Sequence, residues 1–189
     1  MLAARGRAAE LGVATVSSAV GATLTVLATA MGARSVVELG TGTGVTALYL
    51  LAGMADDGVL TTIDIEVEHQ RAAKESFADA GVRTGRTRPI SGRPLEVLPR
   101  LTDQAYDIVL AGGDPHFYPE YVTQSHRLLR TGGLLVVTEA LWHDAVADPA
   151  RRDETTTTVR GVGRSLQEDE RFVTALLPVG GGLLVAAKR

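Results

Sequence analysis

The chain has 189 residues, enough for one domain of ordinary size with a substantial core. Its formal net charge is -3, and its basic residues are scattered along the sequence. Nucleic-acid binding usually requires a dense positive surface, so we expect a small-molecule partner instead. The absence of cysteine excludes disulfides, a thiolate nucleophile and a zinc-thiolate site, and fits a cytoplasmic protein. Only 4% of the residues are aromatic, so the core must consist mainly of Val, Leu and Ala.

The first long uncharged segment, residues 11–33, has two interpretations. It follows Arg5 and Arg7 and ends in small residues, as a secretory signal can. Glu10 just before it, and the Ser, Thr and Gly residues within it, argue against both a signal and a membrane span. We therefore expect a buried helix that packs on the edge of a sheet, near the ligand.

Short apolar runs then alternate with helix-length segments, which is typical of βαβ units wound into a parallel sheet. The predicted strands, each a buried central one, are residues 35–40, 59–64, 86–90, 107–111 and 134–138. The predicted helices between them are residues 43–54, 67–80, 94–101 and 119–129, with Gly81 and residues 131–133 as stop signals. This pattern predicts a Rossmann-like α/β domain with helices on both faces of the sheet.

The end of the chain departs from this alternation. After a loop at 142–152 and an exposed charged helix at 153–170, two apolar runs at 172–179 and 183–189 are separated by only three glycines. A link this short joins antiparallel strands, because a parallel pair needs a crossover of a dozen residues or more. We expect a single domain over residues 1–189, mostly parallel with an antiparallel C-terminal hairpin.

A glycine-rich turn, Gly40-Thr41-Gly42-Thr43-Gly44, follows the first predicted strand and opens a helix. Glycines at such a turn let a ligand approach the backbone and the N-terminal amides of the helix, although a purely structural turn has the same spacing. The second strand ends at Asp64, whose carboxylate can accept hydrogen bonds from ribose hydroxyls or cap a helix. The turn and Asp64 together predict a site for a cofactor that contains a nucleoside.

Glu38 distinguishes between two classes of cofactor. A dinucleotide-binding turn favours the spacing GxGxxG, and its third glycine would stand where this chain has Val45. A carboxylate near a pyrophosphate repels it, whereas near a sulfonium and an α-amino group it is favourable. The string VVELGTGTG therefore favours S-adenosylmethionine (SAM), and a NAD-dependent oxidoreductase becomes the weakest hypothesis.

The chain resembles the catechol-type and caffeoyl-CoA-type O-methyltransferases, especially small actinobacterial members, over nearly its whole length. The resemblance rests on VVELGTGTG, TTIDIE, ISGRPLEVL, DIVLAGGDPHFYPEY, LLVVTEALW, VADP and LPVGGGLL. It implies SAM as the cofactor, S-adenosylhomocysteine as the product, a small-molecule acceptor and a homodimer, with no nucleic acid and no membrane as partner.

The resemblance also implies which residues line the cofactor site. They are Glu38, Gly40, Thr46, Asp64, Ser91, Gly92 and Arg93, beside the turn residues Thr41, Gly42 and Gly44. Glu38 would face the methionine part of the cofactor and Asp64 its ribose. The turn from Ser91 to Arg93 would face the adenine, although Arg93 replaces the acidic residue that is common at its position.

The metal ligands of the family are not retained. Two aspartates and an asparagine hold a divalent metal in the family, and their counterparts here are Gly112, Thr138 and Glu139. Glycine offers no side-chain ligand and threonine only a weak one. The lysine that often follows Asp114 in the family is Pro115 in this chain. We therefore expect methyl transfer to an oxygen without the conventional magnesium mechanism, or else a non-catalytic protein that keeps only the cofactor pocket.

Four side chains at the carboxyl edge of the sheet are candidate proton acceptors in place of a metal: Asp114, His116, Glu139 and His143. The alternative for each histidine is an ordinary solvent-facing side chain. Tyr118, Tyr121 and Trp142 would form an apolar wall for a flat acceptor, with helix packing as the alternative for the two tyrosines.

Overall fold

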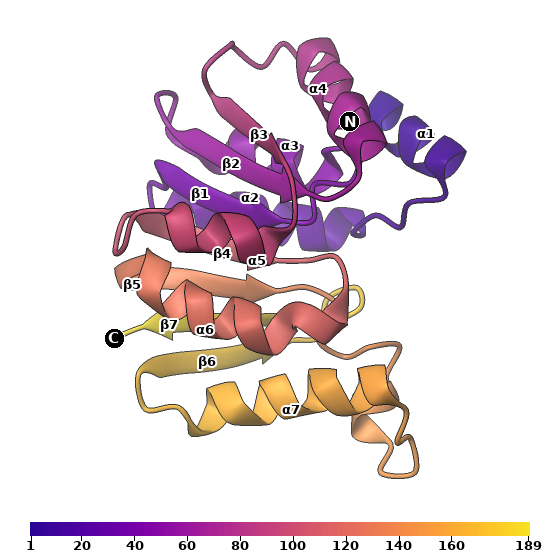
Figure 1. The fold of residues 1–189 in the computed structure, drawn as a ribbon, viewed down its shortest axis with the longest axis vertical. Helices are drawn as coiled ribbons and strands as arrows, with labels where there is room; N and C mark the ends of the chain where they lie inside the picture. The colour runs from indigo at the N-terminus through magenta and orange to yellow at the C-terminus, as the bar shows by residue number, and fades with distance from the viewer.

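The central sheet has seven strands in the order β3-β2-β1-β4-β5-β7-β6, as the computed structural model of residues 1–189 shows (Figure 1). The strands are β1 Ser35–Leu39, β2 Val59–Asp64, β3 Thr87–Ser91, β4 Tyr106–Ala111, β5 Leu129–Val137, β6 Phe172–Leu177 and β7 Leu183–Lys188. Strands β1 to β5 run parallel to one another, whereas β7 pairs antiparallel with both β5 and β6. The predicted mostly parallel sheet with an antiparallel C-terminal hairpin is confirmed.

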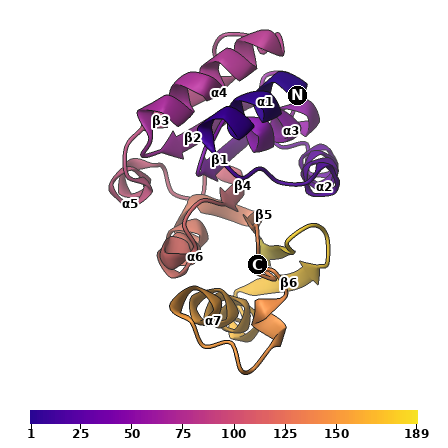
Figure 2. The same cartoon turned by 90° about the vertical axis from the view of Figure 1, so that its right-hand side faces the viewer.

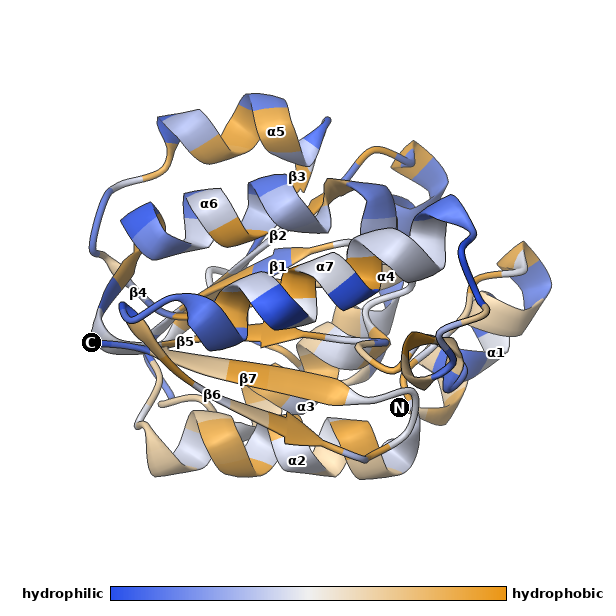
Figure 3. Ribbon diagram, turned by 90° about the horizontal axis from the view of Figure 1, so that it is seen from below, coloured by the Kyte–Doolittle hydropathy of each residue, from blue (hydrophilic) through white to orange (hydrophobic).

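Helices cover both faces of this sheet. They are α1 Leu2–Leu11, α2 Ser18–Ala30, α3 Val45–Gly53, α4 Val67–Asp79, α5 Pro94–Val97, α6 Tyr118–Leu128 and α7 Glu154–Glu168, with single 3₁₀ turns η1 Leu98–Arg100, η2 Pro115–Phe117 and η3 Ala145–Ala147. Because strand side chains alternate between faces, Val36 packs with α2 and α3 while Val37 packs with α6 and α7. Figures 2 and 3 show α2 and α3 on the face opposite α5, α6 and α7.

The N-terminal segment folds as two helices where one was predicted. Gly12 adopts a left-handed conformation that ends α1, and Ser17 caps α2 by accepting a hydrogen bond from the amide of Val20. The expected buried helix is therefore α2, which packs on α3 but leaves Val26 65% exposed. None of the helices combines the length and the apolar composition that a membrane-spanning segment needs.

Two of the strand predictions need correction. β3 is the edge strand of the sheet and is half-exposed, so it is not a buried central strand. β5 begins at Leu129, five residues earlier than expected, because Leu129 pairs with Tyr106 before an irregularity in the register. The predicted stop signal at residues 131–133 lies within this irregular part of β5, where Gly132 has a positive φ of 76°.

Candidate functional site

The site lies where β1 and β4 are neighbours, because the chain connects outward from this pair in opposite directions and leaves a crevice at their carboxyl ends. The ends of the two strands touch. A Cβ atom on Gly40, whose φ is 90°, would lie 2.9 Å from the amide nitrogen of Gly113. Only glycine fits at position 40, both for its backbone conformation and for this close approach.

A pocket of about 600 Å³ opens at this point. The loop before α2, the glycine turn, the carboxyl ends of β2 and β4 and the starts of α4, α5 and α6 all contribute to it. The lining residues are Val13, Ala14, Gly40, Gly42, Ile63, Asp64, Ile65, Glu66, His69, Arg93, Pro94, Leu95, Glu96, Gly112, Gly113, Asp114, Phe117 and Tyr121. Of the residues singled out in the sequence for the cofactor or for catalysis, Gly40, Gly42, Asp64, Arg93 and Asp114 meet here.

Asp64 is only 7% exposed and closes one wall of the pocket. Its Oδ2 accepts a hydrogen bond from the amide of Gly42, and its Oδ1 accepts one from the amide of Glu66, both at 2.9 Å. The N-cap of α4 is Glu66 itself, so Asp64 does not cap that helix but links the glycine turn to the end of β2. His69, which the sequence did not single out, lines the same wall with its Nδ1 3.3 Å from Asp64 Oδ1.

Glu38 lies beneath the glycine turn and does not line the pocket. Its Oε2 accepts a hydrogen bond of 2.6 Å from the hydroxyl of Thr62, which is 2.6 Å from the hydroxyl of Thr41, and Gln70 donates to Thr41 at 2.9 Å. Oε1 of Glu38 is buried and has no partner. Burial raises the pKa of Glu38 to about 8, so its side chain is protonated near neutral pH and brings no full negative charge to the pocket.

The remaining cofactor candidates surround the pocket without lining it. Gly44 is the left-handed N-cap of α3, where a Cβ would collide with the ring of Phe77. Thr46 is half-buried in the first turn of α3. Ser91 ends β3, and the amide of Gly92 donates to the carbonyl of Asp64 at 2.9 Å. The turn that carries Arg93 is thereby fixed beside the wall formed by Asp64.

Asp114 is the only one of the four candidate proton acceptors that lines the pocket. Its Oδ1 accepts hydrogen bonds from the amide of His116 at 3.0 Å and from Nδ1 of the same residue at 2.8 Å. The hydrogen bond from the backbone amide of His116, and then the one from its imidazole, lowers the pKa of Asp114. The Asp114 carboxylate in turn raises the pKa of the His116 imidazole. His116 is exposed behind Asp114, with Nε2 3.9 Å from Glu154 Oε2.

Glu139 and His143 lie outside the pocket. The carboxylate of Glu139 occupies the space that a side chain on Gly181 would need. His143 is exposed, and its ring centroid is 5.4 Å from that of Trp142. Residues 142–144 all have positive φ values, an uncommon conformation for residues other than glycine.

The two tyrosines of α6 have different surroundings. Tyr118 is buried in the core and donates a hydrogen bond from its hydroxyl to the carbonyl of Thr138 at 3.2 Å, which matches the helix-packing alternative. Tyr121 is also largely buried but reaches the pocket, next to Phe117.

The positions of the expected metal ligands offer no set of ligands. Gly112 is buried, and Thr138 Oγ1 lies 3.6 Å from the place where a Cβ on Gly112 would stand. That hydroxyl is close to the carbonyl of Ala111, at 3.4 Å. No group of three or more His, Cys, Asp or Glu side chains is placed to hold a metal ion. Gly112 and Thr138 therefore bring no carboxylate to this point.

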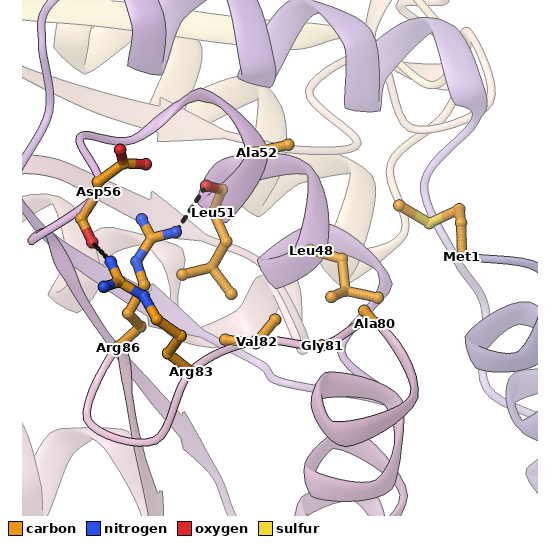
Figure 4. Close-up of a pocket in the computed structure, with 10 residues that line it drawn as sticks. All are labelled: Met1, Leu48, Leu51, Ala52, Asp56, Ala80, Gly81, Val82, Arg83 and Arg86. Carbon is orange, nitrogen blue, oxygen red and sulfur yellow. Dashed lines mark hydrogen bonds between the residues drawn. The ribbon is translucent and has the colours of Figure 1, made fainter.

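A second cavity of about 600 Å³ lies between α3, α4 and the segment that leads into β3 (Figure 4). Its two arginines are engaged by the backbone: Arg83 donates to the carbonyl of Asp56, and Arg86 donates to the carbonyls of Leu51, Ala55 and Gly58. These bonds satisfy carbonyl groups in the last turn of α3 and in the loop between α3 and β2. The cavity contains none of the predicted functional residues, and its arginines have a structural role.

Comparisons with known proteins agree with one another. Residues 4–189 match the family model described as O-methyltransferase. A protein of Mycobacterium ulcerans that is named as an O-methyltransferase is 52% identical over 185 residues, which is 98% of this chain and 83% of that protein. A crystal structure from Corynebacterium glutamicum has a TM-score of 0.91 at 37% identity and covers 98% of this chain and 87% of that one. The O-methyltransferase TomG from Streptomyces achromogenes, solved in complex with SAM, has a TM-score of 0.89 at 28% identity, with 98% and 87% coverage.

Proposed function

From the premise that this chain belongs to the O-methyltransferase family, we propose that it transfers the methyl group of SAM to an oxygen of a small molecule without a divalent metal. The observation that carries the proposal is the pocket that the glycine turn, Asp64 and Asp114 line together. Gly112, which takes the place of a family metal ligand, lines the same pocket without contributing a side chain.

The pocket suggests how the cofactor would lie. Asp64 would accept hydrogen bonds from the ribose hydroxyls at the end of β2, as carboxylates do at this position of Rossmann-like sheets. The adenine would then occupy the apolar end between Ile65 and Leu95, beside Arg93. The methionyl part would extend toward Gly40 and the carboxyl end of β4, which brings the positive sulfonium close to Asp114.

In the proposed reaction the acceptor oxygen attacks the methyl carbon in line with the carbon–sulfur bond. An oxygen–carbon bond forms, the carbon–sulfur bond breaks, and its electron pair returns to sulfur to give S-adenosylhomocysteine. The hydroxyl proton of the acceptor passes to Asp114. His116 stands behind Asp114 and holds its carboxylate in place through the 2.8 Å bond. The main contribution of the protein is alignment of the acceptor with the methyl group.

A methyl-transfer assay with phenolic acceptors, run with magnesium and then with EDTA, tests this proposal. We expect equal turnover in both conditions, and a loss of turnover in Asp114→Asn with unchanged affinity for S-adenosylhomocysteine. Asp56→Asn, an aspartate at the opposite end of β2, is the matched control and should keep wild-type turnover. Turnover that EDTA abolishes would show that the proposal of a metal-free mechanism is wrong.

A second candidate is a non-catalytic protein that binds the cofactor alone. The loss of both family aspartates, at Gly112 and Thr138, favours it. Tight binding of S-adenosylhomocysteine by a protein that methylates no acceptor would support this second candidate. The homodimer and the cytoplasmic location remain predictions, and sedimentation of the purified chain tests the first of them.

A further inference from the structure

One partly buried arginine near the cofactor pocket has a buried donor atom without a hydrogen-bond partner. Arg5 lies in α1, and its Nη1 donates to the hydroxyl of Thr15 at 2.8 Å. Its Nη2 is buried and has no hydrogen-bond partner. A buried donor without an acceptor is unfavourable, so it is uncommon in folded proteins unless a ligand or a water completes it.

Arg5 stands directly behind the wall of the pocket. Thr15, which it holds, follows Val13 and Ala14, the two pocket residues that precede β1. Val13 contacts the glycine turn, because a Cβ on Gly42 would lie 3.3 Å from its Cγ1. The guanidinium therefore lies next to the segment that covers the glycine-turn end of the pocket.

Two further contacts fix α1 at this place. The hydroxyl of Thr43, within the glycine turn, donates to the carbonyl of Ala4 at 2.8 Å in a buried position. The side chains of Ser18 and Arg5 lower the pKa of Tyr49, which belongs to the helix that the glycine turn opens. The helix that carries Arg5 is thus held against the glycine turn.

The side chains that line the pocket carry more negative than positive charge. Four carboxylates line it, from Asp64, Glu66, Glu96 and Asp114. The only permanently charged cation in the lining is Arg93, on the turn after β3. The proposed cofactor carries an α-carboxylate at the end farthest from its adenine, and no lining residue there offers it a positive charge.

We infer that Arg5 is the counter-charge for the α-carboxylate of the methionyl group and offers it the free Nη2 donor. This inference rests on the proposed function, because it requires SAM or its product in the pocket. Nη2 is covered in this structure, so the contact requires the loop at residues 12–17 to shift as the cofactor binds. Several residues of that loop are exposed, among them Gly12, Ala14 and Ser17, whereas Val16 packs against the core and would anchor the end of the loop.

Calorimetric titration with two ligands tests the inference. S-adenosylhomocysteine carries the carboxylate, whereas 5′-methylthioadenosine keeps the adenosine and the sulfur but lacks the amino-acid group. Arg5→Gln should weaken binding of the first about 10- to 100-fold, the range for losing a charge-assisted hydrogen bond, and of the second less than about 3-fold. Thr15→Val removes the contact that holds the loop and keeps the charge, so it should leave the ratio of the two affinities unchanged. Arg7→Gln, on the same helix but paired with Glu75 and Asp79 of α4, is the control for docking of α1.

Each other outcome has a definite meaning. Equal weakening of both ligands by Arg5→Gln would show that Arg5 only holds the loop, and unchanged affinities would show that it has no role; either result overturns the inference. If the wild type binds neither ligand, the proposed function itself fails. If Arg5→Gln does not fold, Arg5→Lys and the wild type are compared with S-adenosylhomocysteine and its decarboxylated analogue. Lysine is shorter than arginine and lacks the paired donors of a guanidinium. Arg5→Lys should therefore reduce the preference for the carboxylate about 10-fold, and an unchanged preference overturns the inference.

Discussion

Replacement of Asp64 by alanine separates the two roles that its position allows. The carboxylate accepts hydrogen bonds from the amides of Gly42 and Glu66, both at 2.9 Å, and Asp64→Ala leaves both donors without this acceptor. A hydrogen bond to a charged group contributes roughly 1.5–3 kcal/mol, and water can reach the exposed Glu66, so the lower figure applies. We expect the free energy of unfolding to fall by about 3 kcal/mol. Loss of the ribose contact should independently weaken binding of S-adenosylhomocysteine by about 1–3 kcal/mol, which is roughly 5- to 150-fold.

Two measurements distinguish these effects. Urea unfolding without ligand reports the loss of the turn contacts, and calorimetric titration reports the ribose contact. Titration with a 2′-deoxyribose analogue of S-adenosylhomocysteine tests the ribose contact more directly. The wild type should bind this analogue more weakly than the parent compound, and Asp64→Ala should bind the two equally. If Asp64→Ala loses stability but binds the parent compound as tightly as the wild type does, Asp64 only fixes the glycine turn and the assignment to ribose is wrong.

Three other predictions follow from the same structure. The pKa of Glu38 is about 8 in the folded state, against an ordinary value of 4.5. The protonated side chain therefore contributes fully to stability below pH 4.5, and this contribution is lost as the pH rises to about 8. In urea unfolding at pH 5, 6.5 and 8, Glu38→Gln should remove a slope of up to about 1.4 kcal/mol per pH unit relative to the wild type, and parallel curves would contradict the raised pKa. Asp114→Asn should lower kcat roughly 10²- to 10⁴-fold. His116→Gln should shift the acidic limb of the kcat–pH profile to higher pH, because the imidazole of His116 helps to lower the pKa of Asp114; an unmoved limb assigns it to another group. Gly53→Ala should destabilise the fold by about 1–3 kcal/mol, because its Cβ would overlap the backbone of α2. Gly163→Ala, in open space on α7, should stabilise the fold by about 0.5–1 kcal/mol. Thermal unfolding measures both changes, and the same sign for the two would refute the packing argument.

The elements of the fold were predictable from the sequence because their signals are local. The alternation of apolar runs with helix-length segments located every strand, and the three glycines at 180–182 located the hairpin. The order of the strands carries no such local signal, so β3 was predicted as a central strand although it lies at the edge. β5 was predicted too short because glycine at positions 132 and 133 normally ends an element, whereas here it serves an irregular strand.

The positions of the candidate residues were easier to predict at the ends of strands than within a strand, where the direction of a side chain decides whether it reaches the pocket. The glycine turn and Asp64 stand at strand ends, which the apolar pattern locates directly. Glu38 lies within β1, and only the packing of the helices decides which face its side chain takes. His69 was missed, although its place five residues after Asp64 puts it in the first turn of α4 and near the same wall. Arg5 had no signal, because its partner Thr15 belongs to a loop without a recognisable motif.

Every residue that lines the cofactor pocket lies between positions 13 and 121, although the sheet continues to position 188. The segment at 139–152, with its run of left-handed residues, follows β5 at the same edge of the sheet but contributes nothing to that lining. Substitutions in this segment should therefore leave the lining of the pocket intact. A library of variants restricted to residues 139–152 should keep the wild-type affinity for S-adenosylhomocysteine, which titration of its members would measure.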